Sequence, residues 1–145
     1  MMLKGISPMI SPELLKILAE MGHGDELVLA DGNFPGTSIG QRCVRCDGHG
    51  CAEVMRAVLQ IFPLDDFVPA PLAVMEVPDG MFEGNKAPIW RDFRDAADTD
   101  LPSAQFDMME HDAFMERARR AYAVVQTGET ALYGNIILRK GVVRA

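Results

Sequence analysis

Four places in the chain combine proton-exchanging or hydrogen-bonding side chains with a position at the end of a predicted helix or strand. They are His23 in the turn Gly22-His23-Gly24-Asp25, Asp31 after an apolar run, His111 before a helix, and the tripeptide Tyr133-Gly134-Asn135 before the last strand. Histidine side chains exchange protons near pH 7. Carboxylate, amide and phenol groups pair well with the hydroxyls of a sugar. The set therefore indicates proton transfer on, or binding of, a hydroxyl-rich small molecule.

Each of these side chains also has a simpler structural explanation. Asp31 could cap a turn, and His111 could cap the helix that follows it. Tyr133 could be packed in the core, and His23 could be an exposed turn residue. Their joint position at element ends favours a site, because ligands in open α/β sheets collect in the loops at the carboxyl ends of strands.

A second group of candidates is the motif Cys43-x-x-Cys46-x-x-His49-x-Cys51, whose side chains are all possible zinc ligands. If residues 42–46 form a strand, Cys43 and Cys46 point to opposite faces, because side chains alternate along a strand. Structural zinc sites also draw on two separated groups of ligands, whereas this motif is a single group. We therefore predict no metal and interpret the cysteines as structural residues; a metal-dependent regulator is the alternative.

Apolar periodicity and turn residues outline the elements that must position these groups. Helices are predicted over residues 12–21, 51–62, 88–97 and 112–120, and strands over residues 27–30, 42–46, 73–77, 105–109, 122–126 and 135–138. Helices and strands alternate through short connections, so we expect an α/β fold, a three-layer α/β/α sandwich with a mixed, mostly parallel sheet. Residues 1–145 are expected to form a single domain, since no repeat or long linker divides them.

The first helix and strand place two of the candidates. Ser11 and Pro12 suit the start of a helix, and Gly22 is expected to end it in the left-handed conformation. The run Leu27-Val28-Leu29-Ala30 has no polar alternation, which predicts a strand buried on both faces. His23 then lies in the turn before this strand, and Asp31 lies just past its carboxyl end.

Composition narrows the class of partner. The 145 residues include 14 basic and 21 acidic side chains, a formal charge of −7, which disfavours nucleic acid and anionic membranes. No run approaches the ~20 apolar residues of a membrane span, and the N-terminal residues do not resemble a signal peptide. With no disulfide framework, we expect a cytoplasmic protein. The motifs typical of dinucleotide, nucleotide triphosphate and acyl-transfer sites are also absent.

The two ends of the chain resemble the ribose pyranase and L-fucose mutarotase family, and most closely its L-fucose mutarotase branch. The resemblance rests on Leu3-Lys4-Gly5-Ile6-Ser7-Pro8, Glu20-Met21-Gly22-His23-Gly24-Asp25-Glu26 and Tyr133-Gly134-Asn135-Ile136-Ile137-Leu138. It spans nearly the whole chain and is weaker over residues 50–105. It implies a layered α/β fold and a monosaccharide mutarotase, an isomerase that interconverts α and β anomers by opening the sugar ring without a cofactor or metal.

The resemblance also implies roles for the candidate residues. The family's catalytic histidine falls on His23, which we expect to donate the proton, and its sugar-binding aspartate falls on Asp31. Its binding tripeptide falls on Tyr133, Gly134 and Asn135, and His111 would help to orient the sugar. Within about 6 Å, Asp31 would also favour the imidazolium form of His23. Family members assemble as rings, commonly decamers, with sites between neighbouring subunits. The alternative function is a non-catalytic monosaccharide-binding or transport-accessory protein.

Two departures from the fucose branch concern the choice of sugar. His111 stands where bacterial fucose enzymes tend to have arginine, whereas the ribose-type branch has histidine. The segment Asp31-Gly32-Asn33-Phe34-Pro35-Gly36-Thr37 stands where fucose enzymes often read Asp-Ala-His-Phe-Pro-Ala-His. The implied substrate is therefore L-fucose or a related sugar.

Overall fold

A six-stranded sheet forms the centre of the computed structural model, which covers residues 1–145. The strands are β1 (Glu26–Ala30), β2 (Cys43–Cys46), β3 (Leu72–Met75), β4 (Phe106–Met109), β5 (Ala123–Thr127) and β6 (Ile136–Arg139). Their order in the sheet is β2-β5-β1-β6-β3-β4. β6 runs antiparallel to β1 and β3, and every other neighbouring pair is parallel. The prediction of a mixed, mostly parallel sheet is confirmed.

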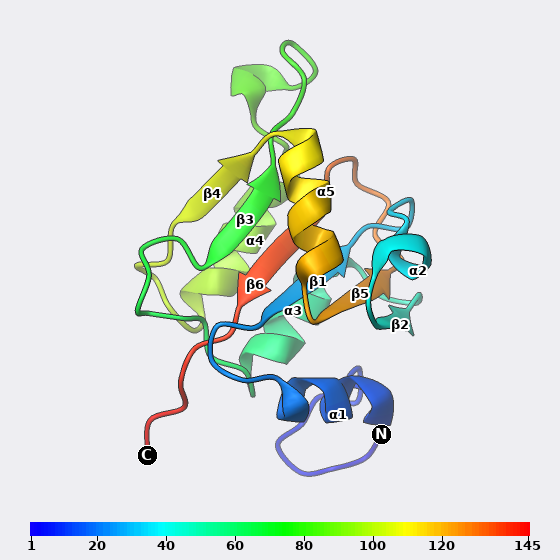
Figure 1. The fold of residues 1–145 in the computed structure, drawn as a ribbon, viewed down its shortest axis with the longest axis vertical. Coiled ribbons are helices and arrows are strands. Elements are labelled where there is room, and N and C mark those ends of the chain that lie inside the picture. The colour runs from blue at the N-terminus through cyan, green and yellow to red at the C-terminus, as the bar shows by residue number, and fades with distance from the viewer.

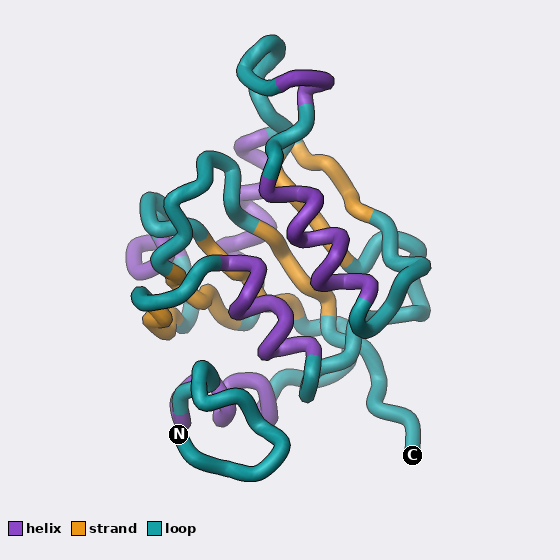
Figure 2. The backbone as a smooth tube through the Cα atoms, turned by 180° about the vertical axis from the view of Figure 1, so that it is seen from behind, coloured by secondary structure: helices purple, strands orange, loops and turns teal.

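Helices cover both faces of the sheet and give the molecule three layers, as predicted. They are α1 (Pro12–Glu20), α2 (Gly36–Ile39), α3 (Cys51–Leu59), the 3-10 turn η1 (Glu83–Asn85), α4 (Ile89–Asp98) and α5 (His111–Arg120). α5 crosses the face of the sheet seen in Figure 1, where α2 also lies, and α3 and α4 cover the opposite face, seen in Figure 2. None of these helices is long and apolar enough to cross a membrane.

β1 contributes side chains to both hydrophobic cores. Leu27 and Leu29 join the larger core, under α1, α3 and α4, whereas Val28 and Ala30 join the smaller core under α5. All four have no exposed surface, which confirms the prediction of a strand buried on both faces. Such a strand gives the residues at its two ends a rigid support.

The turn between α1 and β1 differs from the prediction. The start is as expected, since the Ser11 side chain accepts a hydrogen bond from the Leu14 amide at 3.1 Å. The end is not: Met21 leaves the helix in an extended conformation, and the left-handed residue is Gly24, with a φ of +88°, rather than Gly22. The Gly22 amide instead donates to the Asp25 carboxylate at 2.7 Å, which closes the turn.

Two short helical segments fall outside the predicted elements. α2 lies between the predicted strands 27–30 and 42–46, where no element was predicted, and its single turn is too short to show apolar periodicity. η1 belongs to the segment of residues 76–88 that projects from the end of the molecule between β3 and α4 (Figure 1). The predicted helices and strands are otherwise all present, with boundaries that differ by a few residues.

Candidate active site

The antiparallel direction of β6 brings Asp31 and Asn135 together. Leu29 pairs with Ile136, so the residue that follows β1 lies beside the residue that precedes β6. The Asp31 backbone amide donates a hydrogen bond to Oδ1 of Asn135 at 2.7 Å, and both residues are buried. Gln126, at the end of β5, donates from its side chain to the Asp31 carbonyl oxygen. Three adjacent strands therefore fix the position of Asp31.

The carboxylate of Asp31 is held in a short turn. Its Oδ1 accepts a hydrogen bond from the Asn33 amide at 2.9 Å, which is the turn-capping role considered for this residue. Burial raises the pKa of the Asp31 carboxyl, and hydrogen bonds from the Asn33 amide and the Asn135 side chain offset this only in part. Asp31 is therefore a stronger base than an exposed aspartate.

Asp31 and Asn135 lie in a pocket of about 460 Å³. The pocket is lined by Asp31, Asn33, Phe34, Pro35, Met75, His111, Met115, Tyr133 and Asn135. Four of the predicted site residues are thus brought together, in a pocket that both apolar and polar side chains line. Such a lining suits a monosaccharide, which has both apolar C–H faces and hydroxyls.

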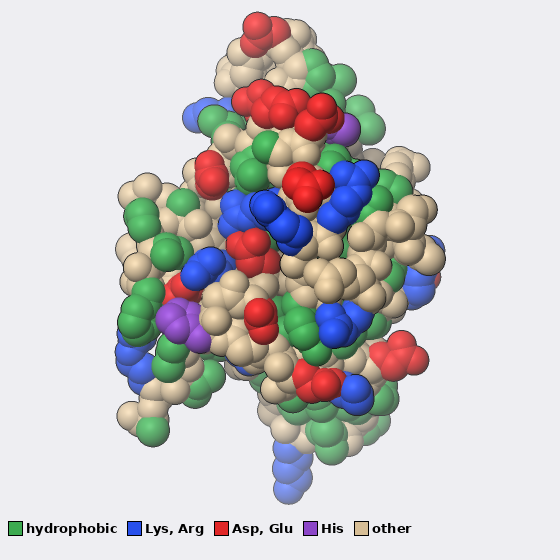
Figure 3. Space-filling model, in the orientation of Figure 1, with side chains coloured by type: hydrophobic (Ala, Val, Ile, Leu, Met, Phe, Trp, Pro, Cys, Tyr) green, Lys and Arg blue, Asp and Glu red, His purple; other side chains and the backbone are tan.

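His111 reaches the pocket from the first turn of α5. It does not cap this helix, because the Glu110 side chain accepts the hydrogen bonds from the amides of Asp112 and Ala113. The His111 ring is exposed, and its Nδ1 lies 2.9 Å from Oδ1 of Asp112. Acidic side chains gather at this end of the molecule (Figure 3), which favours neutral over anionic ligands.

Tyr133 enters the pocket on a left-handed backbone. Its φ is +59°, an uncommon conformation for a tyrosine. The ring lies edge-on to Phe82 of the projecting segment, with 6.5 Å between the ring centroids. Gly134 lies so close to the chain that a Cβ there would be 2.9 Å from the Ala131 carbonyl oxygen. Backbone strain of this kind is common where a side chain is held for function.

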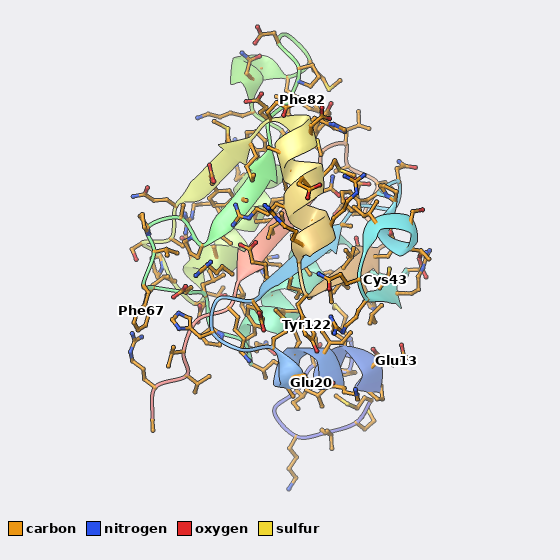
Figure 4. All side chains as sticks on the ribbon, in the orientation of Figure 1. Glu13, Glu20, Cys43, Phe67, Phe82 and Tyr122 are labelled. Atoms are coloured by element: carbon orange, nitrogen blue, oxygen red, sulfur yellow. The ribbon has the colours of Figure 1, made fainter.

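His23 lies at the other end of the molecule. It precedes β1 whereas Asp31 follows it, and the five residues of this strand span about 17 Å at roughly 3.3 Å per residue. Figure 4 labels a phenylalanine at each end: Phe67, whose ring centroid is 4.8 Å from that of His23, and Phe82, next to Tyr133. The condition for a charge interaction between His23 and Asp31 is therefore not met within one chain.

The partner of His23 is Asp65, which the sequence analysis did not single out. Nε2 of His23 lies 3.0 Å from Oδ1 of Asp65, and Arg139 donates to Oδ2 of the same carboxylate at 2.8 Å. Asp65 lies in the loop after α3, 42 residues from His23 along the chain, so no local spacing could have linked the two. We call His23, Asp65, Phe67 and Arg139 the histidine cluster.

The cysteine motif is dispersed in the structure. Cys43 accepts a hydrogen bond from Thr37 of α2 at 3.8 Å, whereas the Cys46 thiol lies 3.9 Å from the Met9 carbonyl oxygen on the opposite side of the sheet. Cys51 is buried at the start of α3, and His49 pairs with Glu53 at 3.3 Å. No three His, Cys, Asp or Glu side chains are grouped so that they could hold a metal ion.

The mixed sheet, with a pocket of polar and apolar side chains at the ends of its central strands, defines a small α/β protein with a candidate site for a compact ligand. The family model described as the RbsD / FucU transport protein family matches residues 4–143, so the chain belongs to this family. The resemblance found at the two ends of the sequence is confirmed.

Individual relatives are similar over nearly their whole length. A protein from Homo sapiens named fucose mutarotase is 49% identical, and the match covers 97% of this chain and 94% of that protein. The crystal structure of the fucose mutarotase from Streptococcus pneumoniae in complex with L-fucose is 43% identical, with a TM-score of 0.88 over 98% of this chain and all of that one. The structure of FucU from Bifidobacterium longum is 46% identical, with a TM-score of 0.90 over 97% of this chain and 100% of that chain.

Proposed function

We propose that this chain is a monosaccharide mutarotase that interconverts the α and β anomers of L-fucose or a related sugar. The observation that carries the proposal is the pocket in which Asp31, His111, Tyr133 and Asn135 converge. Its size and its polar groups fit one monosaccharide, and relatives of similar sequence bear the name fucose mutarotase. His111 and Asn33 line the pocket where the fucose branch has other residues, and we infer that they set the preference among related sugars.

Opening a hemiacetal ring requires two proton transfers. One group takes the proton of the anomeric hydroxyl while another gives a proton to the ring oxygen, and the roles exchange on closure. Asp31 suits the first role because burial raises its pKa. His23 suits the second, and Tyr133 and Asn135 would hold the sugar by hydrogen bonds. The reaction needs no cofactor or metal, since general acid–base catalysis supplies a factor of about 10² to 10⁴.

The distance between the two groups requires a second copy of the chain. A sugar in the pocket is out of reach of His23 in its own chain, so we infer that His23 from a neighbouring copy completes the site. Large apolar side chains are exposed at both ends of the molecule: Phe67 beside His23 is 64% exposed, and Leu132 next to Tyr133 is 57% exposed. Contact between such surfaces would bury them. By resemblance to the family, the assembly is a ring-shaped homo-oligomer, a decamer.

We also infer a cytoplasmic location. The three cysteines are all free, as is usual for proteins in a reducing compartment.

Saturation-transfer NMR tests the proposed activity. With purified protein and a panel of sugars that includes L-fucose and D-ribose, we expect accelerated exchange between anomers for at least one sugar. His23→Ala should abolish the acceleration, whereas His49→Ala, which removes a histidine paired with Glu53 outside the pocket, should preserve it. Binding without accelerated exchange would instead establish the alternative, a non-catalytic sugar-binding protein.

A further inference from the structure

Asp65 is a fully buried carboxylate beside the one histidine to which we assign proton transfer. Its side chain has no exposed surface, whereas that of His23 is 41% exposed. Oδ1 lies 3.0 Å from Nε2 of His23 and also accepts from the Phe67 amide at 3.0 Å. Oδ2 accepts from Nε of Arg139 at 2.8 Å. Both oxygens are thus occupied, and of the two partners His23 and Asp65 only His23 is open to solvent.

The surroundings of Asp65 keep it ionised. Burial alone would raise the pKa of its carboxyl, but hydrogen bonds from Arg139, from the Phe67 amide and from His23 outweigh burial and hold this pKa below its usual range. An ionised carboxylate only accepts hydrogen bonds. Nε2 of His23 must therefore carry the proton that the two groups share.

We propose that Asp65 is a positioning residue that holds the proton on Nε2 of His23, so that Nδ1 is the nitrogen that exchanges a proton with the sugar. No hydrogen bond within the chain reaches Nδ1. Phe67 packs against the ring at a centroid distance of 4.8 Å and an interplanar angle of 57°, which limits its rotation. The inference rests on the proposed mutarotase function, since it specifies how His23 performs its step.

The proton balance follows from this arrangement. When the ring opens, Nδ1–H of the His23 imidazolium gives its proton to the ring oxygen, which keeps the electron pair of the broken C1–O bond. The anomeric hydroxyl gives its proton to the Asp31 carboxylate of the neighbouring copy, and its O–H electron pair forms the aldehyde C=O bond. Asp65 stays ionised throughout and keeps accepting the hydrogen bond from Nε2 of His23. Closure reverses these steps.

The tautomer of His23 can be measured in the unmodified protein. The chain has three histidines, so a ¹⁵N NMR spectrum that correlates ring nitrogens with ring protons is simple, and the His23→Gln spectrum identifies the His23 signals. In the neutral ring we expect His23 to show a protonated Nε2 and an unprotonated Nδ1. A neutral His23 with its proton on Nδ1 would overturn the proposal. This measurement requires no variant of Asp65 to fold.

Asp65→Asn tests the consequence for catalysis. We expect anomer exchange to slow at least about tenfold, which is part of the factor of about 10² to 10⁴ that general acid–base catalysis supplies. We also expect His23 to lose its single tautomer. Asp66→Asn is the matched control, because that neighbouring carboxylate pairs with Arg144 at 2.7 Å and makes no hydrogen bond to His23. Exchange at the unmodified rate in Asp65→Asn would refute the role of Asp65. Unaltered exchange in His23→Ala would instead refute the role of His23 in the proposed function.

Discussion

His23 and Asp31 lie at opposite ends of β1, the strand between β5 and β6 in the middle of the sheet. Every residue of this strand from Leu27 to Ala30 is fully buried, so the two groups cannot approach each other in one chain without unfolding the core. A sugar that touches both groups must therefore lie between two copies of the chain.

A mixing experiment tests this shared site. His23→Ala and Asp31→Asn are each expected to be inactive alone, because every site then lacks one group. If the two variants are unfolded and refolded together, random assembly should restore about one quarter of the unmodified exchange rate, since a site formed by two chains has that chance of receiving both intact groups. Refolding each variant separately before mixing is the control. A mixture that stays inactive would show that both groups act within one chain.

Asn135 is expected to support both the fold and sugar binding. Its Oδ1 accepts a hydrogen bond from the Asp31 backbone amide at 2.7 Å, and Asn135→Ala leaves this buried N–H without a partner. The free energy of unfolding should fall by about 1–3 kcal/mol, the usual penalty for such a group. Urea denaturation measures the loss, and Gln105→Ala, which truncates an exposed amide, is the control. Equal stability of both variants would contradict the role assigned to the Asp31–Asn135 bond.

Gly24 is expected to tolerate no side chain. Its φ is +88°, and an added Cβ would lie 3.1 Å from Nη2 of Arg139, the residue that holds Asp65. Gly24→Ala should cost about 1–2 kcal/mol through the left-handed backbone alone and should displace Arg139 as well. Gly48→Ala is the matched control, because no atom lies within 4 Å of a Cβ there. Thermal unfolding compares the two variants, and equal midpoints would refute the expectation.

The ionised carboxylate of Asp31 is expected to lower the free energy of unfolding, although it contributes to sugar binding. Because its pKa is raised in the folded chain, its charge destabilises the fold above that pKa, and the effect vanishes below the unfolded value of 3.8. Asp31→Asn should therefore raise the free energy of unfolding at pH 7, with a gain that shrinks as the pH falls toward 3.8, and should weaken sugar binding.

Urea denaturation at several pH values and a sugar titration check both parts of this prediction. Asp66→Asn should behave in the opposite way at neutral pH. The hydrogen bond from Arg144 lowers the pKa of Asp66, so its charge contributes stability above 3.8 that is lost as the pH falls through the lowered value. A loss of stability at pH 7 in Asp31→Asn would contradict the expected sign.

Local sequence predicted the elements well and their spatial relationships less well. The unbroken apolar run Leu27–Ala30 revealed a doubly covered strand, and Asp31 follows it as expected. The direction of β6 is not encoded in its own residues, yet it decides that Asn135 meets Asp31. The contact between His23 and Asp65 spans 42 residues, so periodicity and spacing contained no signal for it. The prediction that Gly22 adopts the left-handed conformation was wrong: Gly24 adopts it instead, and either glycine could have done so.

The positions of Tyr133 and Gly134 differ in what they allow: the backbone at 133 is left-handed, whereas position 134 has no room for a side chain. The left-handed backbone at 133 is one that glycine adopts most easily, yet a tyrosine stands there, while the crowded position 134 excludes any Cβ. Exchanging the two residues would preserve the composition of the loop but would remove the phenol from the pocket and force a side chain into the Ala131 carbonyl. The order of these two residues, rather than their presence, therefore carries the information that shapes this wall of the pocket.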